Sequence, residues 1–378
     1  MFRLSHVISL TTGIILMLIA HPSFSATPTV LVSSFAPGDQ GGIQAYQLNT
    51  ESGAITPLHR TGGIPNAFFI AISPDQKFLY SIDAKTFGGS EPEQVAAFRL
   101  ESGNGQLKLI NRQTTRGTAS CFLEVDQTGK SLLVANYSSG NVASYAVQPD
   151  GSLSAPVSFF QHTGSSCNLA RQKEAHAHCF VISPNNKYAY AADLGIDQIL
   201  CYVIDPATAT LTPNTQPFVR TLAGAGPRHL TFHPNGKCLY VINELANSIT
   251  RYDYAAETGM LIERQTISTI PESFAGVTHT ADLKITPNGK FLYGTNRGHD
   301  SVACYQIAED GQLSLIEIVP SLGQGPQNLA ITADGNLLLC ANMPGNNLAI
   351  FRIGMDGKLK SVGTPTEITG PSCIRILK

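Results

Sequence analysis

Short apolar segments alternate with polar turns along most of the chain, and one arrangement of them recurs. Residues 226–244 read GPRHLTFHPNGKCLYVINE, which places two apolar runs around a Pro-Asn-Gly-Lys turn. Two such runs around a tight turn predict a β-hairpin. The same frame occurs six times, at spacings of 46 to 57 residues, with turns at Pro74, Gln127, Pro184, Pro234, Pro287 and Ala333. A repeat of this length predicts the blades of a β-propeller.

A third strand of alternating polarity is predicted seven times, beginning at Gly42, Gln94, Asn141, Gln198, Ser248, Ser301 and Asn347. A fourth follows near Ile55, Leu107, Leu153, Leu211, Leu261, Leu313 and Leu359. Seven third strands and six hairpins leave one hairpin missing, which residues 372–377 and 29–33 can supply from the two ends of the chain. We therefore predict an all-β, seven-bladed β-propeller with four-stranded blades, whose last blade is closed by N- and C-terminal strands.

The composition agrees with a single all-β domain and narrows the range of partners. The chain has 34 Gly and 22 Pro among 378 residues, and no segment sustains a helical period. Charged residues make up 14%, the formal net charge is −2, and no basic run occurs, so nucleic acid and anionic membrane surfaces are poor partners. We expect a monomer.

The N-terminus has the three-part pattern of a secretory signal peptide. Arg3 precedes an apolar run from Val7 to Ala20, and the small residues Ser23 and Ser25 follow. The apolar run is too short for an ordinary membrane-spanning helix. We expect residues 1–26 to be a signal peptide and residues 27–378 to form one propeller domain, exported to the periplasm or secreted. An uncleaved membrane anchor is the alternative.

The eight cysteines do not follow a disulfide framework. Seven of them fall inside predicted strands, where a thiol packs as a small apolar group. Cys167 lies in a polar loop and could pair with Cys179, although spacing alone does not decide whether the geometry permits it.

Equivalent positions of the hairpins locate the residues that break the repeat. Counted from the first turn residue, position minus six carries Phe68, Cys121, His178, Arg228, Ala281 and Gln327, and position plus ten carries Ala84, Tyr137, Leu194, Glu244, Arg297 and Met343. Both positions lie at the end of the hairpin opposite its turn. The charged or titratable members, His178, Arg228, Glu244 and Arg297, fall in three consecutive blades. We expect them to meet at one mouth of the central channel.

Two guanidiniums suit an anionic substrate, because each can bind a carboxylate or phosphate through two parallel hydrogen bonds. Glu244 and His178 would then supply a base and an acid. The structural alternative is an ion-pair network that plugs the channel. His176, His178 and Asp193 also raise the possibility of a metal site, but two arginines in the same mouth would repel a divalent cation. We therefore expect neither a metal nor a cofactor.

Several of these stretches resemble the seven-bladed lactonase family, which contains 6-phosphogluconolactonases of one bacterial type and fungal carboxy-muconate lactonizing enzymes. They are GPRHLTFHPNGKCLYVINEL, the AHAH pair followed by PNNKYAYAADLGIDQI, ANYSSGNVASY and NRGHDSVACY, and the resemblance covers essentially all of the mature chain. It implies a site made of a His, two Arg and a Glu. Matched by motif, these are His178 (or His176), Arg228, Glu244 and Arg297.

The resemblance implies an enzyme that hydrolyses or forms a small anionic lactone, with the arginines holding the anion, Glu244 activating water and His178 protonating the leaving alkoxide. Its best-known substrates, sugar-phosphate lactones, belong to the cytoplasm, whereas this chain carries an export pattern. A muconate-type lactonizing cycloisomerase remains an alternative. An alternative of another class is a non-catalytic exported propeller that binds protein or glycan.

Overall fold

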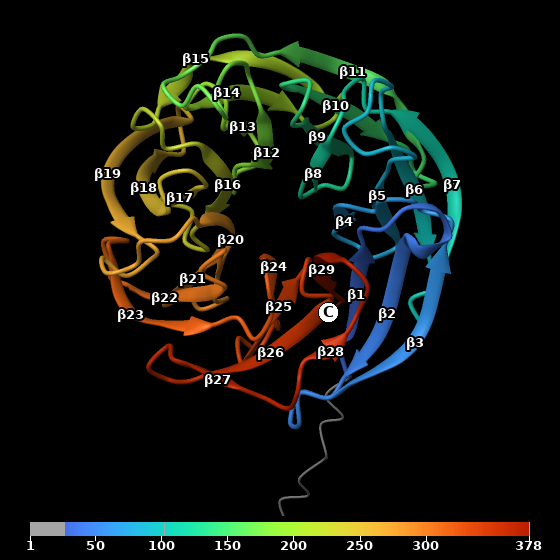
Figure 1. Cartoon of the computed structure of the whole chain (residues 1–378). Coiled ribbons are helices and arrows are strands. Elements are labelled where there is room, and N and C mark those ends of the chain that lie inside the picture. The colour runs from blue at the N-terminus through green and yellow to red at the C-terminus, as the bar shows by residue number, and fades with distance from the viewer. Residues whose placement is uncertain (1–26, 102, 378) are drawn as a thin grey trace, which may run out of the picture.

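The computed structural model describes residues 27–101 and 103–377, which form a ring of seven blades around a central channel (Figure 1). We number the blades from the first complete hairpin. Blade 1 contains β4 (Ile70–Ile72), β5 (Phe78–Asp83), β6 (Gln94–Leu100) and β7 (Leu107–Thr114). Blade 2 contains β8 (Ser120–Val125), β9 (Ser131–Asn136), β10 (Asn141–Val147) and β11 (Leu153–Gln161). Blade 3 contains β12 (Ala177–Ile182), β13 (Tyr188–Asp193), β14 (Gln198–Asp205) and β15 (Thr210–Arg220).

Blade 4 contains β16 (Pro227–Phe232), β17 (Cys238–Asn243), β18 (Ser248–Ala255) and β19 (Met260–Ser268). Blade 5 contains β20 (His279–Ile285), β21 (Phe291–Arg297), β22 (Ser301–Ile307) and β23 (Leu313–Pro320). Blade 6 contains β24 (Pro326–Ile331), β25 (Leu337–Asn342), β26 (Asn347–Ile353), β27 (Leu359–Ser361) and β28 (Thr366–Glu367). Blade 7 contains β29 (Pro371–Ile376), β1 (Thr29–Ser34), β2 (Gly42–Leu48) and β3 (Ile55–Gly62), and a short 3-10 helix, η1 (Gly38–Gln40), precedes β2.

The closure predicted from the sequence is confirmed. The C-terminal strand β29 is the innermost strand of blade 7 and pairs antiparallel with β1, with Val30 opposite Ile376 and Val32 opposite Ile374. In turn β1 pairs with β2, so the two ends of the propeller complete one sheet. This pairing leaves neither end of the repeat as an unpaired inner edge.

The hairpin turns explain why the Pro-Asn-Gly-Lys frame recurs. In blade 4 the amide of Gly236 donates to the carbonyl of His233 at 2.9 Å, and Gly236 has a φ of 70°. Glycine adopts such a left-handed conformation without steric cost. In blade 3 Asn186 takes the same place with a φ of 58°, which asparagine tolerates better than most residues.

Neighbouring blades are joined by a repeated hydrogen bond as well as by apolar packing. In four blades a buried tyrosine of the second strand donates its hydroxyl to a glycine carbonyl of the next blade, at 2.6 to 3.2 Å. The pairs are Tyr80 with Gly151, Tyr190 with Gly259, Tyr240 with Gly311 and Tyr293 with Gly357. A bulky ring is thereby buried between blades while its polar end is satisfied.

The inner strands carry an irregularity that the simple hairpin register did not anticipate. In blade 4, Pro227 faces Asn243 and His229 faces Ile242, so Arg228 has no partner on β17. The same bulge occurs at position minus six in blades 2, 3 and 6, and in blade 5 it spans Ala281 and Asp282. Such a bulge re-aims the side chain that it carries. The minus-six positions, among them His178 and Arg228, are therefore bulge residues, whereas Glu244 and Arg297 lie at the ends of the second strands.

All eight cysteines are free thiols, which settles the question left open for Cys167. Cys167 is exposed whereas Cys179 is buried inside β12, so the two do not pair. The seven strand cysteines are buried, as predicted. Within the described residues, no helix is long and apolar enough to cross a membrane. The predicted signal peptide, residues 1–26, lies outside the part of the chain that the structure describes.

Candidate functional site at one mouth of the channel

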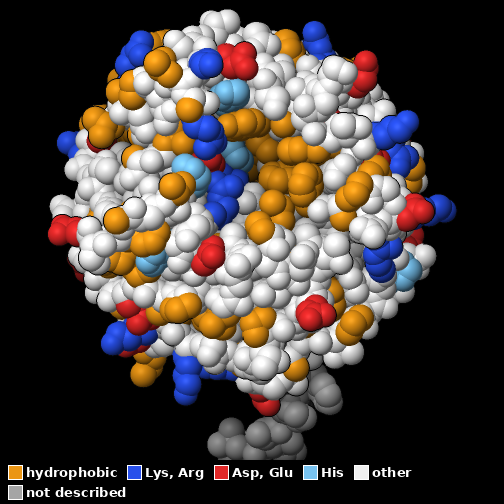
Figure 2. Space-filling view, in the orientation of Figure 1, with side chains coloured by type: hydrophobic (Ala, Val, Ile, Leu, Met, Phe, Trp, Pro, Cys, Tyr) orange, Lys and Arg blue, Asp and Glu red, His pale blue; other side chains and the backbone are white. Residues whose placement is uncertain are grey.

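A cavity of about 220 Å³ opens at the end of the channel opposite the hairpin turns. Its lining contains all four predicted site residues, His178, Arg228, Glu244 and Arg297. The rest of the lining is Phe68, Phe87, Ala119, Cys121, Tyr137, Arg171, Gln327 and Met343. Figure 2 shows the central hollow with basic and histidine side chains on one side and hydrophobic side chains on the other.

Glu244 lies at the centre of the charged side, immediately after β17, and its side chain is 5% exposed. Its carboxylate contacts Arg171 Nη2 at 2.7 Å, Arg228 Nε at 2.9 Å and Arg297 Nη2 at 2.9 Å. Burial alone would raise the pKa of Glu244, but the neighbouring guanidiniums outweigh it and hold this pKa far below its usual range. The carboxylate is therefore ionised and a weak base.

Arg228 is the most deeply buried of the three arginines, with a side chain 1% exposed. Burial and the nearby Arg297 lower its pKa to about 10, so it remains charged at neutral pH. One terminal nitrogen donates to the carbonyl of Ala281. The Nε–H group is close to Glu244 but is not aligned with any acceptor among the described residues. Arg228 therefore has a buried donor that lies against Glu244 without a well-aligned acceptor in the described part of the chain.

Arg297 and Arg171 are more accessible, with side chains 27% and 33% exposed. Arg297, at the end of β21, donates Nη2–H to the carbonyl of Thr280 at 3.0 Å. Arg171 comes from the connection between β11 and β12 and also donates to the hydroxyl of Tyr137 at 3.1 Å. Burial opposes the charge of Arg171, but its hydrogen bonds to Tyr137 and Glu244 raise its pKa.

Arg171 was not found from the sequence, because the register comparison covered only the hairpins. One feature of the chain, the length of the connection that contains Arg171, could have pointed to this residue. Residues 162–176 form the longest connection between an outermost strand and the next innermost strand. Such connections lie at the mouth that holds the cavity, and long loops at the end of a scaffold often carry binding residues. A charged residue in this insertion was therefore a candidate.

The two histidines of the AHAH pair separate in the structure. His178 lines the cavity, is 6% exposed and has Nδ1 3.6 Å from the sulfur of Cys121. Burial and the charge of Arg228 hold its pKa well below the usual value, so the imidazole is neutral. His176 instead stacks on Tyr137, with ring centroids 4.5 Å apart, and lies outside the cavity lining. Of the two, His178 is placed to meet a ligand.

Asp193 is not directed at the AHAH pair as a metal ligand would be. Its Oδ2 lies 2.7 Å from Nδ1 of His162, and its Oδ1 accepts hydrogen bonds from the amides of His176 and Gly195. Among the described residues, no three His, Cys, Asp or Glu side chains are grouped to hold a metal ion.

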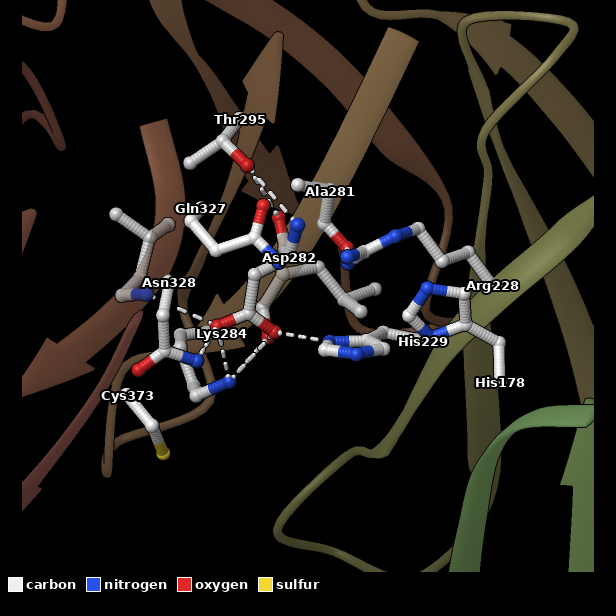
Figure 3. A network of polar contacts seen from close by, with 12 residues as sticks. His178, Arg228, His229, Ala281, Asp282, Lys284, Thr295, Gln327, Asn328 and Cys373 are labelled. Atoms are coloured by element: carbon white, nitrogen blue, oxygen red, sulfur yellow. Dashed lines mark hydrogen bonds and ion pairs between the residues drawn. The ribbon is translucent and has the colours of Figure 1, made fainter. Parts of the chain in front are cut away.

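A second network lies deeper in the channel and is centred on Asp282 of β20 (Figure 3). The carboxylate contacts His229 Nδ1 at 2.8 Å, Lys284 Nζ at 2.7 Å and Asn328 Nδ2 at 2.7 Å. It also accepts a hydrogen bond from the amide of Leu329. Burial would raise the pKa of Asp282, but Lys284 and His229 outweigh it and lower it far below its usual range.

The deeper network connects several blades. His229 lies on β16, Asp282 on β20 and Asn328 on β24. Asn328 Oδ1 accepts a hydrogen bond of 2.8 Å from the amide of Ile374 on the closing strand β29. Burial and the charge of Arg228 lower the pKa of His229 to about 4, so this histidine is also neutral. The network thus ties blades 4, 5 and 6 to the closure of blade 7.

These features define a seven-bladed β-propeller with a cationic cavity at one channel mouth. The chain belongs to the family described as "Lactonase, 7-bladed beta-propeller", whose model matches residues 29–376. It is 34% identical over 298 residues to the 6-phosphogluconolactonase of Bacillus subtilis, covering 79% of this chain and 83% of that protein. The family resemblance drawn from the sequence is confirmed.

Two further relatives agree. The 6-phosphogluconolactonase of Formosa agariphila is 34% identical over 311 residues, which cover 80% of this chain and 86% of that protein. The solved structure of the periplasmic gluconolactonase of Pseudomonas aeruginosa matches with a TM-score of 0.86 and 28% identity, covering 93% of this chain and 99% of that one. The chain is therefore similar to lactonases along nearly its whole propeller.

Proposed function

We propose that the protein is a lactone hydrolase that opens a small anionic lactone at the cationic mouth of the channel. The observation that carries this proposal is the set of three guanidiniums, Arg171, Arg228 and Arg297, around one carboxylate at the edge of a cavity. Guanidiniums bind carboxylates and phosphates through paired hydrogen bonds. The names of the relatives support a lactone as the substrate.

In this proposal the accessible arginines, Arg171 and Arg297, hold the anionic group. Arg228, the most buried of the three, polarises the ester carbonyl and stabilises the negative charge that develops on the carbonyl oxygen. Glu244 keeps the three guanidiniums in place. Because its pKa is so low, it orients the attacking water more readily than it removes a proton.

The proton is handled by His178, whose neutral ring can accept one. As the water oxygen bonds to the carbonyl carbon, its proton passes to the imidazole. When the tetrahedral intermediate collapses, the bond between the carbonyl carbon and the ring oxygen breaks, and the imidazolium returns the proton to the alkoxide. The negative charge of Glu244 favours the imidazolium between these steps. This assignment gives His178 the base role that the sequence had suggested for Glu244.

The decisive experiment is hydrolysis of a panel of anionic lactones by the purified protein, with Arg228→Lys as the test variant. Lysine keeps the charge but loses the planar fork, so kcat/KM should fall tenfold to a hundredfold, about 1.5–3 kcal/mol. The matched control is Arg251→Lys. Arg251 is a buried arginine of the same blade, paired with Asp253 at 2.7 Å and absent from the cavity lining.

Parental activity in the folded Arg228→Lys protein would refute the site. If the variant only melted earlier and kept its specific activity, the arginines would be a structural plug. Identification of the product distinguishes ring opening from the reverse, cyclising reaction. If the folded protein opens no lactone of the panel and also cyclises no muconate, a non-catalytic binding propeller is favoured.

We also propose that the protein acts after export. The pattern of residues 1–26 supports this proposal, and the Pseudomonas relative is described as periplasmic. Mass spectrometry of the native protein should find an N-terminus near Ala26 or Thr27. Intact Met1 in a soluble cytoplasmic fraction would contradict export and would favour a sugar-phosphate lactone as the substrate.

A further inference from the structure

The cavity has a second side that the proposed chemistry leaves without a role. Opposite the arginines, the lining consists of Phe68, Phe87, Ala119 and Met343, which we call the apolar wall. Figure 2 shows hydrophobic side chains on this side of the hollow, facing the basic side chains across it. None of the four wall side chains offers a strong hydrogen-bonding group.

The wall is organised by aromatic packing. The rings of Phe68 and Phe87 are stacked, with centroids 5.0 Å apart and planes inclined by 28°. Phe35 packs edge-on against both, at 5.2 Å from Phe68 and 5.0 Å from Phe87. These phenylalanines come from segments of blades 7 and 1 that flank β1, β4 and β5. Offset-stacked and edge-to-face contacts fix the rings of such a cluster, so the wall is preformed.

Two polar groups between the two sides already have partners. The thiol of Cys121 lies 3.4 Å from the carbonyl of His178, and burial raises its pKa. Gln327 Oε1 accepts a hydrogen bond from Arg297 at 3.4 Å. Because the four wall side chains are apolar, a ligand group that contacts the wall itself finds few hydrogen-bond partners there.

We infer that the substrate is an amphipathic lactone, with an anionic group at one end and a hydrocarbon or aryl group at the other. This inference rests on the proposed function and specifies its substrate class. A ligand hydroxylated on every carbon would turn hydroxyl groups toward the wall, where they would lose hydrogen bonds to water without replacement. An alkyl or aryl group is instead favoured on such a surface, and the anion is then directed to Arg171, Arg228 and Arg297.

The test uses a series of γ-lactone carboxylates that differ only in the substituent across the ring from the carboxylate: hydrogen, butyl or phenyl. 6-Phosphogluconolactone serves as the polyhydroxylated comparison. For the wild-type protein, kcat/KM should rise at least tenfold from hydrogen to butyl or phenyl, because one apolar group in a matching pocket already gives tenfold discrimination or more.

Phe87→Ser should reduce this preference tenfold or more, and Phe68→Ser should do the same. Phe68 is 9% exposed, so its variant must first be shown to fold by its melting curve. Phe87 is less buried and provides the second variant. The matched control is Leu222→Ser, an exposed apolar residue in the β15–β16 connection that does not line the cavity, and it should leave the preference unchanged.

The outcomes separate this inference from the proposed function. Hydrolysis that is best with 6-phosphogluconolactone, with a ranking unchanged in Phe87→Ser, would confirm a lactonase and overturn the amphipathic substrate. If no lactone is opened, the lactonase proposal fails, and the wall is tested by calorimetric binding of the ring-opened carboxylates. Tighter binding of the butyl or phenyl acid, lost in Phe87→Ser, would support the wall as a ligand surface, and equal binding across the series would overturn it.

Discussion

The centre of the propeller holds two buried carboxylates whose surroundings differ in charge balance. The side chains of Glu244 and Asp282 are 5% and 1% exposed, and the pKa of each is lowered by its partners. Glu244 faces three guanidiniums, which leaves an excess of two positive charges beside a cavity. Asp282 is matched by one ammonium, a neutral imidazole, an amide side chain and a backbone amide.

The difference in charge balance suggests a criterion for distinguishing a ligand-binding network from a structural one. The deeper network is electrically balanced and its carboxylate is saturated with hydrogen bonds, so it needs no ligand. At the mouth the cations outnumber the carboxylate and border open space, which supports our proposal that an anion binds there. Buried ion pairs are weak evidence for stability, but an unbalanced set beside a cavity favours ligand binding.

The largest loss of stability should come from removing β29. Of the two networks, the deeper one is hydrogen-bonded to this strand, through Asn328 and Ile374. Deletion of residues 372–378 leaves β1 without its inner partner and removes the amide of Ile374, which donates a hydrogen bond to Asn328 Oδ1. We expect loss of cooperative unfolding, measured by circular dichroism and calorimetry, because the ring can no longer close. A melting profile like that of the full chain would show that closure by β29 is dispensable.

Breaking the balanced network itself should be the next most damaging change. Asp282→Ala leaves the ammonium of Lys284 and the side chain of Asn328 without their acceptor, so the free energy of unfolding should fall by about 3–5 kcal/mol. Urea denaturation measures the loss. The matched control is Asp356→Ala, an exposed carboxylate paired with the exposed Lys358 at 3.8 Å, which should cost less than about 1 kcal/mol. Equal losses in the free energy of unfolding would mean that the buried network around Asp282 stabilises the protein no more than a surface ion pair does.

The fold could be predicted from the sequence because each of its signals is local. A Pro-Asn-Gly-Lys turn, an apolar run and a third strand of alternating polarity can each be recognised within one blade, and all three recur in successive blades. The seven third strands begin at the predicted residues, from Gly42 in β2 to Asn347 in β26. The closure of blade 7 by the two chain ends followed from the count of seven third strands against six hairpins.

The site was only partly predictable, because its remaining members depend on features that a regular register does not describe. Asp282 lies one position beyond the compared one, inside a bulge that spans two residues. Arg171 and Phe87 come from connections, where no repeat fixes a position. The different placements of His176 and His178 depend on the start of β12 and on stacking against Tyr137. Sequence spacing alone does not contain this information.

Within the unbalanced network, Glu244→Gln should lower the turnover of the protein that remains folded. The amide keeps the volume but no longer pairs with three cations, so the guanidiniums are held less firmly. We expect kcat to fall roughly tenfold to a hundredfold, while KM for an anionic lactone changes less because the positive charge remains. Steady-state kinetics test this, with Asp253→Asn as control. A loss confined to KM would show that Glu244 acts in binding alone.

The smallest expected effect is a pH dependence that originates in the deeper network. The pKa of His229 is lowered to about 4 in the folded protein, by burial and by Arg228, from an ordinary value of about 6.5 in the unfolded chain. Between these values the unfolded state binds more protons, so stability rises with pH and is lost as pH falls from 6.5 toward 4. Glu124 opposes this trend, because burial raises its pKa to about 7.

His229→Gln separates the two contributions, because Glu124 is present in both proteins. The free energy of unfolding at pH 7 minus that at pH 4.5 should be about 1–2 kcal/mol lower in the variant than in the wild-type protein. Glutamine can still donate to Asp282 but does not titrate. Urea denaturation across this pH range measures it, with His59→Gln on the outer strand β3 as control. An unchanged pH dependence would mean that the channel interior does not keep His229 neutral. The deeper network would then carry a positive charge of its own, and charge balance would no longer distinguish it from the mouth.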